Sequence, residues 1–596
     1  MSEPFEDSRR LTGANLYFDG PGAALEVVPG IAFDEAALRR WCANIARARA
    51  ALGWPDGAIV VREHPGGASL AFEAPADQLY AATEVGEWAL YSALGLRAGD
   101  TPVDDESEQP RPHVAHFDDD EALRRLRALA DAEARPALIA LLDAARVHRV
   151  PAHADDDVLS IGEGASSASW PADELPAVDA VPWTGLHGVP KAVVTGSNGK
   201  TTTVRLLAAM LKAHGLRSGY SSTDGLFIDG ERVDVGDYSG PVGARTVVRD
   251  ARVQAAVLET ARGGLLRRGL VANDARVAVV TNVSADHFGE YGIHDLDDIA
   301  AVKLVVAKSL APDGLLVLNA DDPVLVRNGA STGAARIGWF ALDLDAALER
   351  GLPSCGVRDG RLILASADGG HALEEHDLGA VAAMPLTVGG SARYNIANIA
   401  AASLAAHALG VAPATIASVL ARFGATNADN PGRLQRWTLG DVEVLLDYAH
   451  NPDGLRGLLA VAAGLRRGGR MALLLGHAGN RLDEDFHALA AVAAGAKPDR
   501  VWLKDIAGDY LRGRESGEVA GILRDALLAN GMAGDALPVC LDEAQAAREA
   551  LAWARGGDLL VLPVHEPSAR DAVVALLDRL QSGGWRAGEP VPDALE

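Results

Sequence analysis

Cysteine and lysine are scarce in this sequence of 596 residues. The three cysteines, Cys42, Cys355 and Cys540, lie far apart and are odd in number, which argues against a disulfide framework and against a metal site built from clustered cysteines. A reducing compartment fits this usage best. Lysine occurs only seven times among the 55 lysine and arginine residues, so a lysine inside a motif stands out.

Long apolar runs are also missing. No stretch approaches the roughly 18 apolar residues that a transmembrane helix needs, and the first ten residues, MSEPFEDSRR, lack the basic and then apolar order of a signal peptide. The formal net charge of −26 repels nucleic acids and acidic membrane surfaces. We therefore expect a cytoplasmic protein that binds neither nucleic acid nor membranes.

The remaining composition, with 48% hydrophobic and 23% charged residues, is that of a folded protein of several domains. Residues 1–154 mix short apolar stretches with helical patterns, which predicts a small α+β domain. Proline, glycine, serine and acidic residues break every periodicity in residues 155–188, the expected linker. Apolar runs alternate with helical stretches in residues 189–428 and again in residues 429–596, which predicts two α/β domains with largely parallel sheets.

The segment VVTGSNGKTTT, residues 193–203, follows an apolar strand and opens an apolar-periodic helix. Two glycines allow a tight turn whose N–H groups face a phosphate, and the helix N-terminus adds positive partial charge. Lys200 would reach the β- and γ-phosphates, and the Thr201 hydroxyl would bind Mg²⁺. The pattern is a shortened P-loop, because Val194 stands where a glycine is usual. The predicted phosphate-binding residues are Gly196, Ser197, Asn198, Gly199, Lys200, Thr201 and Thr202.

Chemically active side chains also follow the next two predicted strands. Glu259 ends the strand AAVLET, where a carboxylate can bind Mg²⁺. His287 follows the strand VAVVTNV, and Lys303 lies sixteen residues further along, in a helical stretch. Taken singly, such a histidine or lysine is as often structural as functional. Because parallel strands end at one edge of their sheet, we expect these groups and Lys200 to meet in one crevice.

Several strings together resemble the Mur ligase superfamily. They are TGSNGKTTT, ETARGG, NVSADH, NADDP, RYNIANIAAA, PGR and DYAHNP, and the resemblance covers residues 189–596. Within that superfamily, the chain is most similar to the Mur-ligase-like half of cyanophycin synthetase, through STDGLFIDGERVDVGDYSGP, ETARGGLLRRGL and LRGRESGE. The ATP-grasp module of that enzyme is not matched, because only the expected linker occupies its place.

The resemblance implies a central P-loop domain, a Rossmann-like C-terminal domain, and ATP with Mg²⁺ bound between them. A substrate carboxylate would take the γ-phosphate, and an amine would then displace phosphate from the acyl phosphate. Lys200 would stabilise the transferring phosphate, while Thr201 and Glu259 would hold one Mg²⁺. His287 and Lys303 would serve a second Mg²⁺, with Lys303 as a carbamate in some relatives. The further nucleotide-binding residues implied are Asn395, Asn398, Arg433, Asp447 and His450.

Arg512 and Arg514 flank Gly513 in the string LRGR. Two guanidinium groups in this arrangement would clamp a substrate carboxylate. In a chain so rich in arginine, two solvated loop side chains are nearly as good an interpretation.

Three functions remain open at this point. The first is an ADP-forming ligase that joins an acidic amino acid or aspartate-containing peptide to arginine or a similar amino acid. The second is a ligase of the same chemistry with other substrates, as in folylpolyglutamate or cell-wall precursor synthesis. The third is a non-catalytic accessory partner of a complete cyanophycin synthetase. We also expect either a homo-oligomer or association with such a synthetase.

Overall fold

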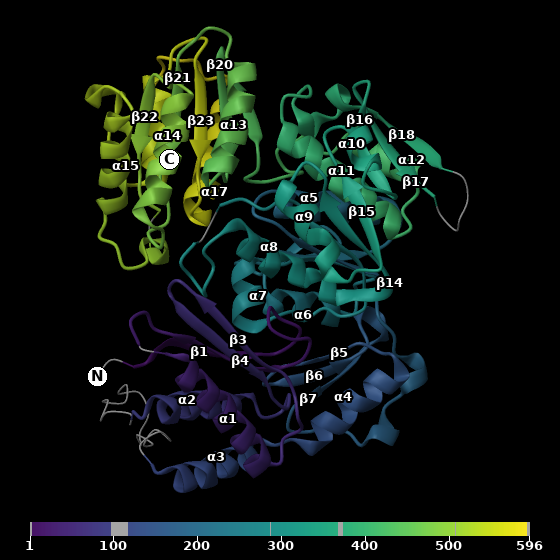
Figure 1. Ribbon diagram of the computed structural model, residues 1–596. Helices are drawn as coiled ribbons and strands as arrows, with labels where there is room; N and C mark the ends of the chain where they lie inside the picture. Colours follow the sequence, from purple (N-terminus) through teal and green to yellow (C-terminus); the bar gives the residue numbers. More distant parts are fainter. Residues whose placement is uncertain are drawn as a thin grey trace.

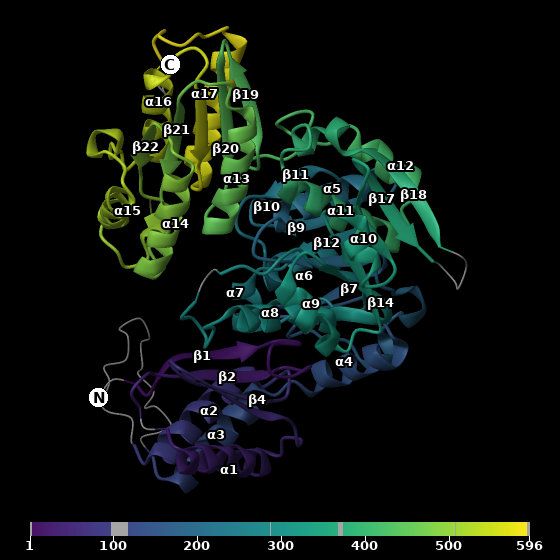
Figure 2. The ribbon, with the colours of Figure 1, turned by 45° about the horizontal axis from the view of Figure 1, so that its top comes forward.

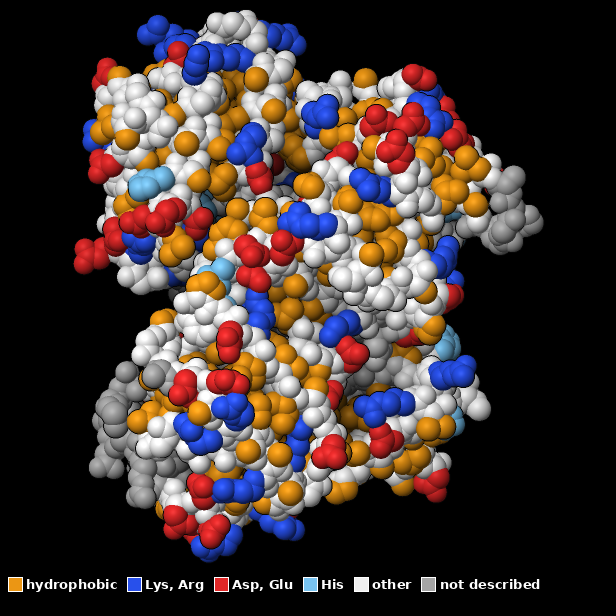
Figure 3. Space-filling model, in the orientation of Figure 1, with side chains coloured by type: hydrophobic (Ala, Val, Ile, Leu, Met, Phe, Trp, Pro, Cys, Tyr) orange, Lys and Arg blue, Asp and Glu red, His pale blue; other side chains and the backbone are white. Residues whose placement is uncertain are grey.

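The computed structural model describes residues 3–31, 33–96, 117–285, 288–367, 373–506 and 508–592. The chain forms an N-terminal, a central and a C-terminal domain, and the central domain lies between the other two (Figures 1 and 2). In the part of the chain that the structure describes, no helix has the length and apolarity to cross a bilayer. Acidic and basic side chains are interspersed over all three domains on the face drawn in Figure 3.

The N-terminal domain contains a four-stranded antiparallel sheet in the order β1-β2-β4-β3. Its core includes Trp41, Phe72 and Trp88, which pack the helices against one face of the sheet. The predicted α+β character is therefore confirmed. The elements are β1 (Phe5–Leu11), β2 (Gly22–Val27), α1 (Glu35–Leu52), β3 (Ile59–His64), β4 (Gly67–Glu73), α2 (Leu79–Leu94) and α3 (Asp119–Glu133).

Residues 155–188, the expected linker, are folded. They contribute two of three strands to a small antiparallel sheet in the order β5-β6-β7. The carboxylate of Glu163 is fully buried and lies 2.9 Å from both His153 Nε2 and Lys191 Nζ. The linker prediction was wrong because strands this short show no apolar periodicity. Its elements are α4 (Pro136–His148), β5 (Ala152–Ala154), β6 (Val158–Ile161) and β7 (Ala168–Pro171).

An eleven-stranded sheet organises the central domain, in the order β11-β10-β9-β12-β8-β13-β14-β15-β16-β17-β18. The strands from β9 to β16 in this order run parallel, and the outer strands are antiparallel. The strands are β8 (Lys191–Thr195), β9 (Ser218–Ser222), β10 (Gly225–Ile228), β11 (Glu231–Asp234), β12 (Ala255–Glu259), β13 (Ala275–Val280), β14 (Leu310–Asn319), β15 (Arg336–Phe340), β16 (Ser354–Arg358), β17 (Arg361–Ser366) and β18 (Glu374–Ala380).

Helices cover both faces of this sheet and enclose two apolar cores. The predicted parallel α/β arrangement is confirmed. The helices are α5 (Lys200–Ala213), α6 (Pro241–Arg249), α7 (Arg262–Arg268), α8 (Leu296–Leu304), α9 (Pro323–Asn328), α10 (Leu344–Leu348), α11 (Arg393–Ala408) and α12 (Pro413–Leu420).

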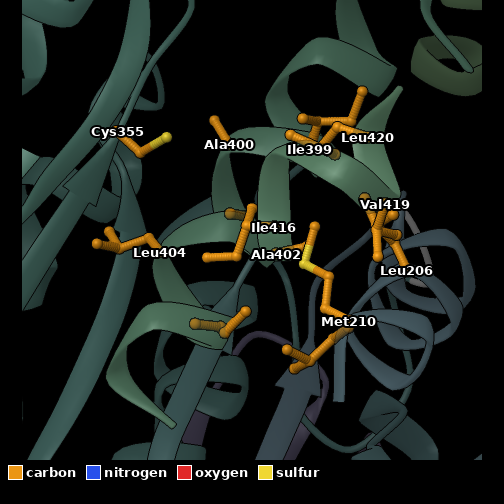
Figure 4. Packing of buried hydrophobic residues seen from close by; sticks show 14 of the residues in the cluster. Leu206, Met210, Cys355, Ile399, Ala400, Ala402, Leu404, Ile416, Val419 and Leu420 are labelled. Carbon is orange, nitrogen blue, oxygen red and sulfur yellow. The ribbon is translucent and has the colours of Figure 1, made fainter. Parts of the chain in front are cut away.

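The alanine-rich helix α11 is buried over most of its length. Figure 4 shows its residues Ile399 and Ala402 in one cluster with Leu206 and Met210 of α5. Small alanine side chains allow α11 to approach its neighbours closely, and a helix that is apolar on most sides belongs in a protein interior. This packing holds the N-terminal part of α11 beside the start of α5.

The C-terminal domain has a five-stranded sheet in the order β19-β20-β23-β21-β22, parallel except for β19. Apolar cores lie on both faces of this sheet, which confirms the second α/β domain. The elements are β19 (Gln435–Leu439), β20 (Val442–Asp447), α13 (Pro452–Leu465), β21 (Met471–Leu475), α14 (Asp483–Gly495), β22 (Arg500–Leu503), α15 (Glu518–Ala529), α16 (Glu543–Trp553), β23 (Leu559–Pro563) and α17 (Pro567–Ser582).

Candidate functional site

The turn between β8 and α5 adopts a conformation that requires its two glycines. Gly196 has φ +149° and Gly199 has φ +86°, both in the region that side chains avoid. A Cβ atom on Gly196 would lie 1.8 Å from Thr281 Oγ1, and one on Gly199 would lie 2.1 Å from Asn398 Oδ1. The turn is therefore tightly packed, and its glycines cannot be replaced without displacing their neighbours.

The loop that follows β13 fixes the shape of this turn. The Asn282 Oδ1 atom accepts a hydrogen bond from the Asn198 N–H at 2.9 Å, and Thr281 Oγ1 donates to the Asn198 carbonyl at 2.6 Å. Ser197 Oγ and the Ser284 N–H are 3.0 Å apart. Strands β8 and β13 are parallel neighbours, with Thr195 beside Val280, so the two loops leave the same edge of the sheet.

Helix α5 begins at Lys200, directly after the turn. Its N-cap, Gly199, has no side chain to bind the N–H groups of the first turn, which leaves this position suited to an anion. Lys200 Nζ donates to the carbonyls of Gly196 and Ser197 at 3.0 and 3.2 Å. The predicted lysine therefore lies directly over the turn.

Glu259 ends β12, beside the turn. Its side chain is 1% exposed, Oε1 accepts a hydrogen bond from Thr223 Oγ1 at 2.8 Å, and Oε2 is buried without a hydrogen-bond partner. Burial raises the pKa of Glu259, although Lys200 opposes this shift. An unsatisfied buried oxygen is costly in a protein, but hard carboxylate oxygens are what Mg²⁺ binds. The arrangement of Glu259 and Thr201 therefore fits a Mg²⁺ ion.

The C-terminal domain lies beside the turn, and the two together line a cavity of about 340 Å³ that is open to solvent. Arg433 lies in the segment before β19, and its Nη2 atom is 3.4 Å from Thr201 Oγ1. Its guanidinium also lies 4.3 Å from the centre of the Tyr448 ring. Ten predicted site residues line the cavity from the turn, α5, β12 and α11: Ser197, Asn198, Gly199, Lys200, Thr201, Thr202, Glu259, Asn395 and Asn398, together with Arg433.

Asp447 and His450, also predicted, line the same cavity from the end of β20. Asp447 Oδ2 accepts a hydrogen bond from the Leu434 N–H at 2.7 Å, and burial raises the pKa of this carboxyl group despite the nearby Arg433. His450 Nδ1 lies 3.2 Å from the Tyr448 carbonyl. Gly196 shapes the turn without lining the cavity.

Asn395 and Asn398 are buried at the cavity wall, with exposed fractions of 1% and 4%. Asn395 Nδ2 donates to the Leu386 carbonyl at 3.0 Å, and Asn398 Nδ2 donates to Asn395 Oδ1 at 3.2 Å. Both asparagines are therefore buried and hydrogen-bonded and do not form a solvated helix face. Asn398 is also the side chain that contacts Gly199, so α11 supports the turn directly.

Of the two residues predicted to serve a second metal, Lys303 and His287, the structure describes only Lys303. Lys303 lies on α8, is 4% exposed, and is not among the described residues that line the cavity. His287 lies outside the residues that the structure describes. Within the described residues, no group of three or more His, Cys, Asp or Glu side chains is arranged to hold a metal ion. A metal in the cavity would thus need a hydroxyl or phosphate oxygen beside Glu259.

The two arginines expected to clamp a carboxylate are used differently. Arg514 donates to Glu518 and Asp483, both at 2.7 Å, and its remaining donors bind backbone carbonyls of the same domain. It would have to break these contacts to bind a substrate. Arg512 is exposed. Neither lines the cavity in the part of the chain that the structure describes.

Sequence reasoning missed several residues of the site. Thr223 binds Glu259, and Tyr448 packs against Arg433. Asn451 Nδ2 donates to Asn198 Oδ1 at 3.0 Å across the two domains. Thr223 belongs to the string STDG, and the other two belong to DYAHNP, so position within these strings was the signal available. Residue type alone did not single them out.

Two family models match the domains that form the cavity. Residues 194–406 match the Mur ligase middle domain, and residues 432–563 match the Mur ligase glutamate ligase domain. The cyanophycin synthetase of Trichormus variabilis is 38% identical over 380 residues, which are 63% of this chain and 41% of that protein. The chain thus spans less than two thirds of this relative's length.

A second curated protein and a solved structure are less similar to this chain. The UDP-N-acetylmuramoyl-L-alanyl-D-glutamate–2,6-diaminopimelate ligase of Xanthomonas campestris is 29% identical over 64% of this chain and 74% of that protein. The structure of E. coli FolC with DHPP and ADP has 22% identity and a TM-score of 0.47, and it covers 65% of this chain and 88% of that one. On the two family models, the chain belongs to the Mur ligase superfamily, whose middle and glutamate ligase domains form the cavity described above.

Proposed function

We propose that the protein is an ATP-dependent, ADP-forming ligase that joins a carboxylic acid to the amine of an amino acid. One observation carries the proposal: a single cavity between two domains brings together the phosphate-binding turn, a buried carboxylate oxygen and the guanidinium of Arg433. Phosphoryl transfer depends on positioned positive charge more than on a covalent protein nucleophile, and this cavity supplies such charge.

The reaction would take place in two steps. A carboxylate oxygen of the acid attacks the γ-phosphorus of ATP, the bond to the bridging oxygen breaks, and ADP leaves with that electron pair. The amine nitrogen then attacks the acyl carbon and loses a proton, and inorganic phosphate leaves. Lys200, the first turn of α5 and Arg433 would hold the phosphates and offset the charge that develops on them.

Mg²⁺ would be held by Glu259 and Thr201, with a phosphate oxygen. When bound, it supplies positive charge at the β- and γ-phosphates. We propose His287 and Lys303 for a second Mg²⁺. An unmodified lysine cannot bind a cation, so this role requires a carbamate on Lys303. We further propose that Asn395 and Asn398 lie near the base, and that Asp447 and His450 complete the nucleotide site.

For substrates, we propose an aspartate-containing peptide as the acid and arginine or a similar amino acid as the amine. The similarity to cyanophycin synthetase supports this choice. Arg512 and Arg514 would bind the substrate carboxylate if Arg514 exchanged its present partners. Self-association, or association with a complete cyanophycin synthetase, is part of the same proposal.

The test is release of inorganic phosphate by the purified protein with ATP, Mg²⁺ and pairs of acids and amines. Release that needs both an aspartate-containing peptide and arginine would support the proposed substrates. Release only with folate or cell-wall precursor acids would instead indicate the same chemistry on other substrates. If no pair caused release, an accessory role beside a complete synthetase would replace the proposal.

The metal assignment has its own test in Glu259→Gln. The amide keeps the hydrogen bond with Thr223 but removes the negative charge, so the Mg²⁺ concentration for half-maximal nucleotide binding should rise about tenfold or more. Fluorescent-nucleotide titration against Mg²⁺ measures this change. Glu231→Gln, on the exposed strand β11, is the control and should behave as the wild type. An unchanged Mg²⁺ dependence would remove Glu259 from the metal site.

A further inference from the structure

Asp224 lies in the turn between β9 and β10, and three arginines from separate segments surround its carboxylate. Arg205 Nη2 is 2.8 Å from Oδ2, Arg433 Nη2 is 3.4 Å from Oδ2, and Arg570 Nη1 is 2.6 Å from Oδ1. The side chains of Asp224 and Arg570 are 7% and 8% exposed. Asp224 is thus the common partner of all three arginines.

These arginines come from the elements whose relative position defines the cavity. Arg205 lies on α5 of the central domain, Arg433 lies in the segment between the domains, and Arg570 lies on α17 of the C-terminal domain. The ion pair between Asp224 and Arg570 joins residues 346 positions apart in the sequence. It therefore links the two domains directly.

The segment before β19 is fixed by the same cluster. Arg205 Nη1 donates to Asn430 Oδ1 at 3.1 Å and to the Pro431 carbonyl at 2.7 Å. Gly432 has φ +69°, and a Cβ atom there would lie 2.9 Å from Arg570 Cδ. The chain therefore passes between Arg205 and Arg570 immediately before it presents Arg433 to the cavity.

The neighbouring residue ties Asp224 to the metal-binding position. Thr223 donates to Glu259, so the turn that carries Asp224 also orients this carboxylate. Burial opposes a charge on Asp224, but Arg433, Arg205 and Arg570 outweigh this effect and keep the pKa of Asp224 well below its ordinary value. The group is thus ionised, with three positive partners, at neutral pH.

We propose that Asp224 is a positioning residue that holds the C-terminal domain over the phosphate-binding turn before nucleotide binds, chiefly through Arg570. Arg433 is then already placed for the triphosphate when it arrives. The proposal rests on the proposed nucleotide site. It assigns to Asp224 a share of the apparent nucleotide affinity and no direct contact with substrate.

The expected effect follows from the population of the binding-competent arrangement. If Asp224→Asn lowers this population to about a tenth, the KM for ATP and the dissociation constant of a non-hydrolysable ATP analogue with Mg²⁺ should rise about tenfold. Nucleotide itself holds the domains together once bound, so kcat should change less than about threefold. Asp229→Asn, in the exposed turn between β10 and β11, is the matched control and should leave all three constants unchanged.

Arg570→Met removes only the partner on the C-terminal domain. It should raise the dissociation constant of the analogue similarly. The double variant, Asp224→Asn with Arg570→Met, should bind no worse than Asp224→Asn, because both changes break the same Asp224–Arg570 contact. Small-angle X-ray scattering without nucleotide should give a larger radius of gyration for either variant. At saturating analogue and Mg²⁺, the radius of gyration of both variants should equal that of the wild type.

Two results would overturn the proposal. The first is a lower melting temperature without any change in analogue affinity or radius of gyration, which would mean a merely structural role. The second is an equal loss in kcat and kcat/KM, which would place Asp224 in the transition state rather than in domain positioning. Binding and scattering need no turnover, so they remain informative if the wild-type protein proves to be no ligase.

Discussion

Lys200 lies where the partial positive charge of a helix N-terminus and a full side-chain charge coincide. Its ammonium binds two carbonyls of the turn, so a phosphate that enters would compete with weak neutral acceptors. Charged hydrogen bonds to phosphate are about twice as strong as those to neutral groups. The exchange should therefore favour the bound nucleotide.

Replacement of this lysine should remove catalysis without unfolding the chain. Alanine is a good helix former, so Lys200→Ala should leave the melting temperature within a few degrees of the wild type. Turnover should fall about a hundredfold or more, as for loss of a positioned charge at a transition state. Phosphate release and circular dichroism measure the two effects. The control Lys212→Ala, near the exposed C-terminal end of the same helix, should keep full activity. Full activity in Lys200→Ala would disprove the P-loop assignment.

The residues that sequence could predict share a local signature. Lys200 and Thr201 follow two glycines within a short segment, and Glu259 ends an apolar strand. Asp224 has no such signature, because its partners are brought to it from α5, the domain connection and α17. An arginine-rich sequence offers many partners for any aspartate. Only the three-dimensional arrangement selects Arg205, Arg433 and Arg570 among them.

At the scale of elements, the turn before α5 depends on contacts with α11. Gly199 combines a positive φ with close contact to Asn398. Gly215, just after the same helix, has φ +95°, but a Cβ atom there would have no described atom within 4 Å outside its own chain neighbours. Comparing substitutions at Gly199 and Gly215 therefore separates the free-energy cost of a positive φ from the cost of the contact with Asn398.

Gly199→Ala should therefore lower the affinity for nucleotide by at least about tenfold, because Asn398 and the turn must move apart. Strain at a positive φ costs about 1–3 kcal/mol, and this part of the loss should appear in both variants. Gly215→Ala should lower the free energy of unfolding by that amount but bind nucleotide normally. Denaturant titration and analogue binding test the pair. Equal nucleotide affinity in both variants would contradict the role given to Asn398.

A buried charged cluster lies behind the strand ends of the C-terminal domain. Lys504 Nζ forms an ion pair with Glu543 and is 3.1 Å from His565 Nδ1. His565 Nε2 lies 3.1 Å from the carbonyl of Ala449, which lines the cavity between the central and C-terminal domains. Burial, followed by the charge of Lys504, lowers the pKa of His565 below its ordinary value of 6.5. The folded state therefore keeps this imidazole neutral.

The sign of the pH dependence follows from this shift. The unfolded chain takes up a proton on His565 near pH 6.5, whereas the folded chain resists it, so stability present above that pH is lost on acidification. Glu543, whose pKa is lowered from 4.5, stays ionised in both states until lower pH. The melting temperature should fall between about pH 7.5 and pH 5. This fall in melting temperature should be smaller in His565→Gln, whereas the control His214→Gln, at an exposed position, should show the same fall as the wild type. An equal fall in His565→Gln and the wild type would rule out His565 as the source.

Element prediction succeeded where patterns were long. The alternation of apolar runs and helical stretches identified both α/β domains, because strands buried on both faces read as apolar runs. The folded unit at residues 155–188 was not predicted because its two strands have only four residues each. Its Glu163 also forms a buried ion pair with Lys191, which a search for apolar periodicity cannot detect.

At the scale of the whole molecule, the N-terminal domain is bound to the element that follows Glu259. Arg9 on β1 is 3% exposed, and its guanidinium is 2.6 Å from Glu26. Its Nε atom donates to the Leu266 carbonyl on α7 at 2.9 Å. The guanidinium also lies 4.6 Å from the centre of the Tyr291 ring. The N-terminal domain therefore contacts α7 and the loop that carries Tyr291 in the central domain.

Replacement of Arg9 should lower the free energy of unfolding considerably. Arg9→Met leaves the buried Glu26 with Ser69 but without its arginine partner, and breaking a buried ion pair costs about 3–5 kcal/mol in comparable cases. The midpoint of the first unfolding transition in denaturant should fall accordingly. Arg39→Met removes an exposed pair with Glu35 on α1 and should change stability by less than about 1 kcal/mol. A similar, small effect of both variants would show that the interface does not depend on Arg9.

Asn451 forms two hydrogen bonds at the junction of the central and C-terminal domains. Its Oδ1 atom caps α13 by accepting from the Gly454 N–H, and its amide nitrogen donates to Asn198 in the turn before α5. A rearrangement of the turn is thereby passed to a rigid helix about 20 Å long without any intermediary. A small shift of the turn should therefore be transmitted directly to α13, through the hydrogen bond between Asn198 and Asn451.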